Sequence, residues 1–178
     1  MTKQIISLFC LSILTYLCLF PLGCIQKLPP GIPTLYPAEI TIIQDGKPLA
    51  DASVVIINLT PSVNWSGGGN TNKNGVLKLK TMGQYHGVPL GKYKVSVQKI
   101  EYPGDIVLPL NPPYEDKAAM KEYNRLLKKY EDNTFQLVDN KFSLINTPLV
   151  FEVTPQNLRI TLDVSPAIRM KAPTSPQG

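Results

Sequence analysis

Apolar and polar residues alternate over several short stretches of the chain, a pattern that predicts β-strands with one buried face. The clearest stretch is residues 92–100, in which Tyr93, Val95 and Val97 share one face. Residues 76–81 alternate in the same way. Other predicted strands are short and rich in β-branched residues, and they cover 39–44, 53–59, 147–153 and 157–164. Together these strands predict an all-β domain over residues 38–164.

Residues 53–59 differ from the other predicted strands because every residue from Val54 to Ile57 is apolar. A continuous apolar run of this length is typical of a strand at the centre of a sandwich. The run is too apolar for a half-solvated face. We therefore expect this strand to be central and covered on both sides.

Turn sequences separate the predicted strands. Asp45-Gly46 and Asn74-Gly75 are tight-turn pairs, because glycine adopts a positive φ without steric cost. The three glycines at 67–69 have no side chains to pack, so they form either a loop or the flat, bulged start of a strand. A further turn at 154–157 predicts that the two last strands pair with each other in antiparallel orientation.

A helical period interrupts the strands between residues 114 and 130. Asn111 suits a helix N-cap and Pro112 a first turn, so we expect an inserted amphipathic helix at about 112–131. We expect its apolar stripe to pack on the sandwich, and a partner-binding or membrane-surface helix is the alternative. Its polar face mixes acidic and basic residues, which makes anionic lipid a poor partner. The stripe consists of Ala119, Met120, Tyr123, Leu126, Leu127 and Tyr130.

The two ends of the chain have other patterns. Residues 1–24 are typical of an export signal, since one charge, Lys3, precedes a long apolar run. That run is also close to the ~20 residues that span a bilayer, so a retained anchor and an ordinary secretory signal stay open. Residues 25–37 are proline-rich and predict a stiff tether. Residues 165–178 contain three prolines and are predicted to be a disordered tail.

The end of the apolar run, Pro21-Leu22-Gly23-Cys24, resembles the lipobox of bacterial lipoproteins, although Pro21 stands where that family usually has leucine. In that family the signal is cut before the cysteine, whose thiol receives a diacylglycerol. The resemblance implies that Cys24 is the lipidated residue. It also implies a protein held at a membrane of the cell envelope, the outer rather than the inner one, without crossing it.

Composition and charge exclude several classes of function. The net charge is +5 over 178 residues, and the lysines and arginines are scattered rather than set in a stripe with stacking aromatics, so we expect no nucleic-acid partner. All three cysteines lie in the first 24 residues, and His86 is the one histidine. The body of the protein therefore has no thiolate metal site, and a His-based metal site or a serine–histidine triad is hard to build with a single histidine. We therefore expect no cofactor, no metal and no enzymatic activity.

Three turn-and-strand motifs stand in order along the chain: Gly46-Lys47-Pro48-Leu49 before one strand, Asn70-Thr71-Asn72-Lys73-Asn74-Gly75 before another, and Val88-Pro89-x-Gly91-x-Tyr93-x-Val95-x-Val97. They resemble the carboxypeptidase regulatory-like, or transthyretin-like (prealbumin-like), β-sandwich family in its planctomycete-type lipoprotein form. The resemblance covers roughly residues 38–101 and part of 147–164, with Asn72 where the family's turn usually has aspartate. It implies a seven-stranded Greek-key sandwich and offers no catalytic residue to transfer. The residues that match the motifs are Gly46, Pro48, Leu49, Thr71, Gly75, Gly91, Tyr93 and Val95.

These observations favour a non-catalytic, lipid-anchored envelope protein that acts in binding or assembly, with an envelope protein or a glycan as its partner. One alternative is a carbohydrate-binding module, whose contacts would be Trp65, Tyr85 and Tyr102. Another is a transthyretin-like hydrolase, which would need His, Arg and Ser side chains clustered around His86. The sequence does not indicate an oligomeric state.

Overall fold

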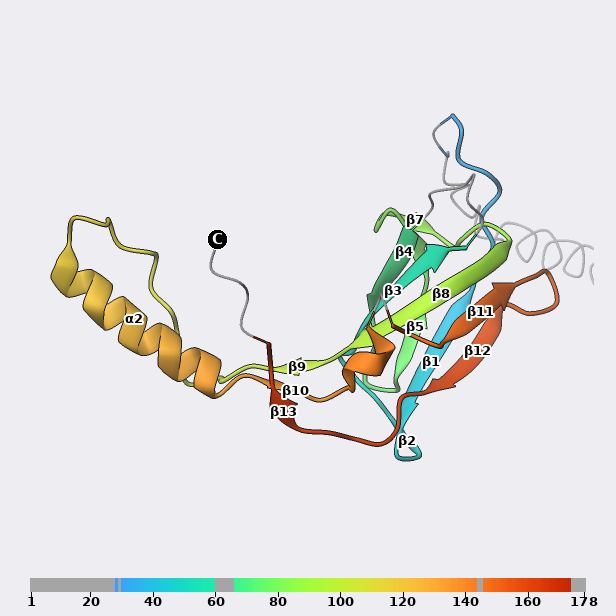
Figure 1. The fold of residues 1–178 in the computed structure, drawn as a ribbon. Coiled ribbons are helices and arrows are strands. Elements are labelled where there is room, and N and C mark those ends of the chain that lie inside the picture. Colours follow the sequence, from blue (N-terminus) through green and yellow to red (C-terminus); the bar gives the residue numbers. More distant parts are fainter. Residues whose placement is uncertain (1–27, 29, 60–65, 144–145, 174–178) are drawn as a thin grey trace, which may run out of the picture. The chain divides into compact units, whose positions relative to one another are not determined.

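The computed structural model describes residues 28, 30–59, 66–143 and 146–173. It divides the chain into two units, residues 1–32 and 33–178, and the fold is that of the second unit (Figure 1). The described residues form three sheets, one α-helix and one 3-10 helix, so the domain is mainly β. The elements are β1 (Glu39–Gln44), β2 (Lys47–Pro48), β3 (Ser53–Asn58), β4 (Ser66–Asn70), β5 (Val76–Lys78), β6 (Lys80–Thr81), β7 (Tyr85–His86), β8 (Gly91–Gln98), β9 (Ile100–Glu101), α2 (Lys117–Asp132), β10 (Phe135–Gln136), η2 (Asn140–Phe142), β11 (Val150–Val153), β12 (Arg159–Asp163) and β13 (Met170–Lys171).

The largest sheet has six strands in the order β11-β8-β3-β4-β6-β7. Strand β3 lies between β8 and β4 and is antiparallel to both, which confirms the predicted central strand. Its second face is not covered, because Val55 and Ile57 are 40% and 37% exposed. The prediction that both faces of this strand are buried is therefore wrong. Only Val54 and Ile56 point into the core.

The second sheet is organised around β1. Strand β12 pairs with β1 in parallel, with Glu39 opposite Arg159, while β2 and β5 pair with β1 in antiparallel orientation. Strands β11 and β12 thus belong to different sheets, although a short turn joins them and Thr154 forms a bridge with Asn157. The expected antiparallel pair of these two strands is wrong. The turn instead carries the chain from one sheet to the other.

The core lies between these two sheets, and each strand contributes alternate residues. The side chains of Tyr93, Val95 and Val97 are almost fully buried, which confirms the face predicted for that strand. Strand β1 adds Ile40 and Ile42 from the opposite sheet. The shared core is consistent with an all-β sandwich. Further members are Val54, Ile56, Leu77, Leu79, Phe151, Val153, Leu162 and Val164.

Backbone geometry explains one glycine-containing turn and one glycine-rich strand. Asp45 and Gly46 have φ values of 50° and 73°, the conformation of a type I′ hairpin turn, which confirms the tight turn predicted there. The glycines at 67–69 lie in β4, so the strand alternative is correct and the loop alternative is wrong. A Cβ atom on Gly68 would lie 2.2 Å from the carbonyl oxygen of Val54. Strands β3 and β4 approach closely only because this side chain is absent.

The helix begins later than predicted. The carboxylate of Asp116 accepts a hydrogen bond from the backbone N–H of Ala119 at 2.9 Å, so Asp116 is the N-cap. The expected N-cap at Asn111 and start at 112 are wrong, since those residues belong to the loop before the helix. The predicted end at 131 is one residue from the observed end at Asp132.

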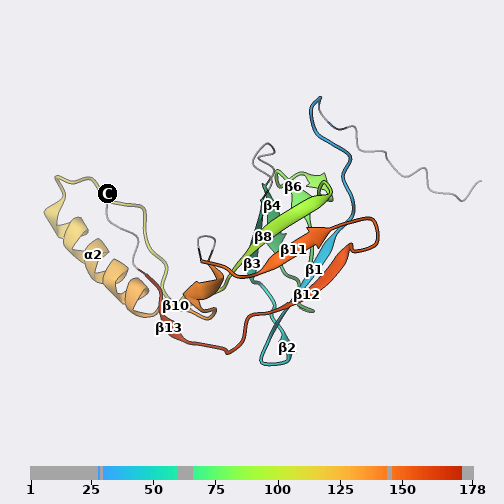
Figure 2. The same cartoon turned by 45° about the vertical axis from the view of Figure 1, so that its right-hand side comes forward.

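The apolar stripe of α2 does not pack on the sandwich. No residue of α2 is buried, and the core cluster includes none of them. The chain leaves the sandwich through β9, passes along residues 102–116 to α2, and returns through β10 (Figures 1 and 2). Tyr102, just after β9, stacks on Tyr130 of the helix with ring centroids 6.1 Å apart. We call residues 102–116 the covering loop.

A small third sheet, in the order β13-β10-β9, forms the base of this insertion. Its central side chain is Phe135, and the guanidinium of Arg169 lies 3.5 Å from the Phe135 ring centroid. Arg169 also pairs with Glu101 of β9 at 3.3 Å. The prediction of a disordered tail from residue 165 is therefore wrong for 165–173, because pairing and cation–π contacts fix β13. Residues 174–178 lie outside the described part.

The predicted tether overlaps the domain at its end. The backbone N–H of Tyr36 donates to the carbonyl of Val88 at 2.8 Å, and the N–H of Val88 donates to the carbonyl of Tyr36 at 3.0 Å. The sandwich thus begins about two residues before the predicted boundary at 38. The predicted signal segment, residues 1–24, lies outside the described residues.

Candidate functional site

The structure brings together few of the residues that the sequence singled out. Cys24 and Trp65 lie outside the described residues. Tyr85 is half-buried in β7, at the edge of the six-stranded sheet, whereas Tyr102 follows β9 in the small third sheet. The ring of Tyr102 is also stacked on the ring of Tyr130. The two described tyrosines therefore do not form a common stacking platform for a sugar.

His86 is exposed and lies beside Tyr85 in β7. In the part of the chain that the structure describes, no group of three or more His, Cys, Asp and Glu side chains is arranged to hold a metal ion. Among the same residues, the pKa shifts are confined to a buried tyrosine, an exposed aspartate and one surface ion pair. In that pair, a hydrogen bond from Arg125 lowers the pKa of Glu122.

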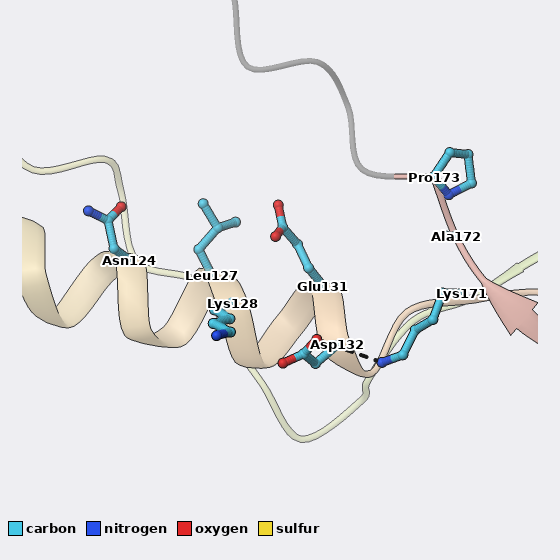
Figure 3. A pocket seen from close by; sticks show the side chains of 8 residues that line it. All are labelled: Asn124, Leu127, Lys128, Glu131, Asp132, Lys171, Ala172 and Pro173. Atoms are coloured by element: carbon cyan, nitrogen blue, oxygen red, sulfur yellow. Dashed lines mark ion pairs between the residues drawn. The ribbon is translucent and has the colours of Figure 1, made fainter.

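The surface with the most distinctive chemistry lies along one side of α2. A cleft of about 700 Å³ lies between the C-terminal half of the helix and residues 171–173, at and just after β13 (Figure 3). Asn124, Leu127 and Glu131 point to the same side of the helix as Pro173 in this view. A second hollow of about 430 Å³ lies at the N-terminal half of the helix, and Tyr114 lines it. Asn124 lines both.

Helical spacing explains why one side of α2 lines both hollows. Residues three and four apart share a face, and the lining residues of α2 follow that spacing from the first helical residue to the last turn. We call this surface the open face. Its residues are Lys117, Met120, Lys121, Asn124, Leu127, Lys128 and Glu131.

The start of the covering loop, at Tyr102, lies against a different side of the helix, whereas Tyr114 near its end lines the hollow of the open face. Tyr130 stacks on Tyr102 there, and Tyr123 is half-buried. Ile106 of the covering loop is buried, although it does not belong to the sandwich core. Part of the predicted apolar stripe is thus covered locally, while Met120 and Leu127 border the open face.

The open face has an uneven charge distribution. Lys117, Lys121 and Lys128 have no ion pair with any described residue, whereas Lys171 at the edge of the cleft pairs with Asp132 at 3.8 Å. Two carboxylates of the last turn, Glu131 and Asp132, line the cleft, and Asp132 is the one that pairs with Lys171. The face therefore combines two apolar side chains with three lysines and a terminal acid.

Sequence reasoning missed this surface because it placed all apolar residues of the helix in a single stripe. The lysines at 117, 121 and 128 recur at intervals of four and seven, which puts them on one side of a helix. This spacing of lysines is the feature of the sequence from which the open face could have been predicted. Which side the covering loop occupies depends on contacts such as Tyr102 with Tyr130, and these are not visible in the helical period.

No protein-family model, curated protein or solved structure matches the chain. Within the described residues, none of the helical segments has the length and apolar content needed to cross a bilayer. The class that the structure defines is a mainly β domain with two sheets around one core and an inserted helix. Its candidate functional site is the open face of that helix.

Proposed function

We propose that this protein is a non-catalytic, lipid-anchored module of the cell envelope that binds or assembles with another macromolecule through the open face of α2. One observation is central to the proposal. The helix presents apolar and basic side chains but contributes none to the sandwich core. Methionine is adaptable and enriched at interfaces, so a helix surface with Met120 and Leu127 outside the core is suited to macromolecular contact.

The sandwich is proposed to have the seven-stranded Greek-key fold of the carboxypeptidase regulatory-like family. Local geometry at the motif residues supports this assignment. The side-chain oxygen of Asn72 accepts hydrogen bonds from the backbone N–H groups of Asn74 and Val76, a role that the family's aspartate could also fill. The buried hydroxyl of Thr71 donates to Leu49 and accepts from Ala52, which joins the turn to the strand before it.

The anchor is proposed to be a diacylglycerol on Cys24, and the lipobox resemblance supports it. The full chain is expressed in a bacterial host with lipoprotein processing, and the mature N-terminus is analysed by mass spectrometry. We expect diacylated Cys24 at the N-terminus. The Cys24→Ser variant should lose the lipid, while the control Cys18→Ser keeps it. An intact Met1, or an unmodified mature N-terminus, would contradict the anchor.

Binding through the open face is tested by site-specific photo-crosslinking in cells. A photoreactive phenylalanine analogue replaces Asn124 on the open face, or Lys129 on another side of the same helix as a matched control. We expect covalent adducts from position 124 and few or none from position 129. If neither position gives an adduct, the open face is not a binding surface.

A further inference from the structure

We propose that residues 107–113 of the covering loop form a second recognition site, a polyproline II ligand that binds a groove lined by aromatic side chains on a partner protein. We call these residues the exposed segment. They end one residue before Tyr114, which lines a hollow of the open face. The inference therefore goes beyond the proposed function, which concerns the open face alone.

Three prolines set the backbone of the exposed segment. Pro109, Pro112 and Pro113 make up three of its seven residues. Proline fixes φ at about −65° and holds the residue before it in an extended conformation. Residues 106–112 belong to no helix or strand, and their backbone groups form no hydrogen bond with the described backbone. Polyproline II has these same features, since it is extended and has no internal hydrogen bonds.

The apolar side chains of the exposed segment face solvent. Leu110 is 95% exposed, more than any other large apolar side chain in the described residues, and Val107 is 84% exposed. Polyproline II has about three residues per turn, so Val107, Leu110 and Pro113 lie along one edge. Pro113 is exposed as well. An uncovered apolar edge of this kind marks a site of interaction.

Both ends of the exposed segment are fastened to the domain. Ile106, just before it, is buried. After it, the backbone N–H of Asp116 donates to the carbonyl of Pro113 at 3.1 Å, and the Asp116 carboxylate caps α2. A segment with fixed ends and several prolines loses little conformational entropy on binding. The exposed segment is thus preorganised as a ligand.

The prolines decide among the ways in which proteins bind extended or helical segments. A segment that adds to a sheet edge pairs through alternate residues, and Pro109 and Pro112 differ in parity. Either register would therefore place a proline, which has no N–H, at a pairing position. Prolines also prevent the segment from binding as a helix. The remaining mode is a polyproline II segment in an aromatic-lined groove.

A membrane surface is a poorer partner for this segment. Asp105 precedes it, Glu115 and Asp116 follow it, and Lys117 is the one basic residue in the range 102–117. Anionic headgroups attract clusters of lysine and arginine rather than acidic residues. The charges instead favour a groove with basic side chains at its ends.

The test uses the full chain in isolated envelopes of the cells that make it. A photoreactive phenylalanine analogue replaces Leu110, or Gly104 of the same loop as a matched control, where a side chain meets nothing within 4 Å. After irradiation we expect an adduct with a protein from position 110 and none from position 104. A lipid adduct from position 110, equal adducts from both positions, or no adduct overturns the inference.

Substitutions within the exposed segment test the role of the prolines. Pro109→Ala/Pro113→Ala removes two rings and restores backbone freedom, so the yield of the adduct from position 110 should fall about tenfold. Asn111→Ala lies off the apolar edge and keeps all three prolines, so the yield should stay within about twofold. Circular dichroism checks that each variant is folded. Equal yields from the two variants would contradict polyproline II recognition.

A competing peptide shows whether the segment is recognised by itself. Polyproline II has no internal hydrogen bonds, so a peptide of residues 105–115 can adopt it without the domain. Excess peptide should abolish the adduct from position 110, and the same peptide with alanine at its three prolines should not. If both peptides compete equally, or neither does, the partner does not recognise polyproline II.

The outcomes separate this inference from the proposed function. Photo-adducts from position 124 report the open face and are measured in the same envelopes. Adducts from position 124 without any from position 110 overturn the second site and leave the proposed function standing. Adducts from position 110 that depend on the prolines, without any from position 124, support the second site and contradict the open face.

Discussion

At the scale of single residues, the close approach of β3 and β4 depends on Gly68. The Gly68→Ala substitution would place a Cβ atom 2.2 Å from the carbonyl oxygen of Val54, and backbone atoms cannot rotate away. We expect a loss of about 3 kcal/mol in the free energy of unfolding, measured by urea denaturation. The control is Gly104→Ala, where a Cβ atom meets nothing within 4 Å. Equal stability of the two variants would show that the strands can separate without cost.

The ionisation of Tyr93 makes the stability of the fold depend on pH. Its ring is almost fully buried, and its hydroxyl donates to the carbonyl of Pro89 at 2.8 Å. Burial raises the pKa of Tyr93 above its ordinary value of 10.0, and a hydrogen bond with Asn58 opposes this in part. Because the folded state favours the neutral phenol, the resulting stabilisation is complete below pH 10 and is lost as the pH rises through the folded-state pKa.

The Tyr93→Phe variant tests this effect. At neutral pH we expect a loss of about 1 kcal/mol, because the hydrogen bond to Pro89 is removed. Above pH 10 the unfolding free energy of the unsubstituted chain should fall more steeply than that of the variant. Unfolding curves collected from pH 8 to 11 provide the measurement, and Tyr114→Phe is the exposed control. If the unfolding free energies of Tyr93→Phe and the unsubstituted chain change in parallel with pH, the dependence of stability on Tyr93 ionisation is contradicted.

At the scale of elements, Asn72 organises the turn before β5. Its side-chain oxygen accepts from the N–H groups of Asn74 and Val76 at 2.9 and 3.1 Å. Asn72→Asp keeps an acceptor at this position and should leave stability within about 0.5 kcal/mol. Asn72→Ala removes both bonds and should cost about 1 kcal/mol, measured as a shift in the urea midpoint. A destabilised aspartate variant would indicate that the amide group itself is needed.

The elements also show what local sequence determines. The type I′ turn at Asp45-Gly46 and the inner face of β8 are fixed by backbone freedom and alternation, and both were predictable. The position of the helix N-cap was not predictable, because Asn111 and Asp116 are both good capping residues. The choice depends on where the covering loop ends. The exposed Val55 likewise could not be foreseen, since exposure depends on whether another layer covers β3.

The candidate site was less predictable than the strands. Met120 and Leu127 were recognised as apolar positions of a helix, but their placement on the open face depends on which side the covering loop occupies. That choice is made by contacts between distant residues, such as Tyr102 with Tyr130. The three lysines gave a periodic signal that a search for catalytic or metal-binding groups does not detect. The ordering of β13 likewise depends on Arg169 and Phe135.

At the scale of the whole molecule, α2 and the sandwich should be separable. No α2 residue belongs to the core, and Glu101 already pairs with Phe135 at the base of the insertion. Replacing residues 103–133 by Asn-Gly should therefore close β9 and β10 into a hairpin. We expect the urea midpoint of the sandwich to be nearly unchanged, because the shorter loop also lowers the entropy cost of closure. Loss of cooperative unfolding would show that the helix supports the core.

The parallel pairing of β1 with β12 has a consequence for how the chain acquires its structure. Glu39 lies opposite Arg159, so these two strands meet only when nearly the whole domain is present. Contacts between residues so far apart in sequence form slowly, because a long loop must close before they yield stabilisation. During synthesis the second sheet therefore stays incomplete until its last strand emerges.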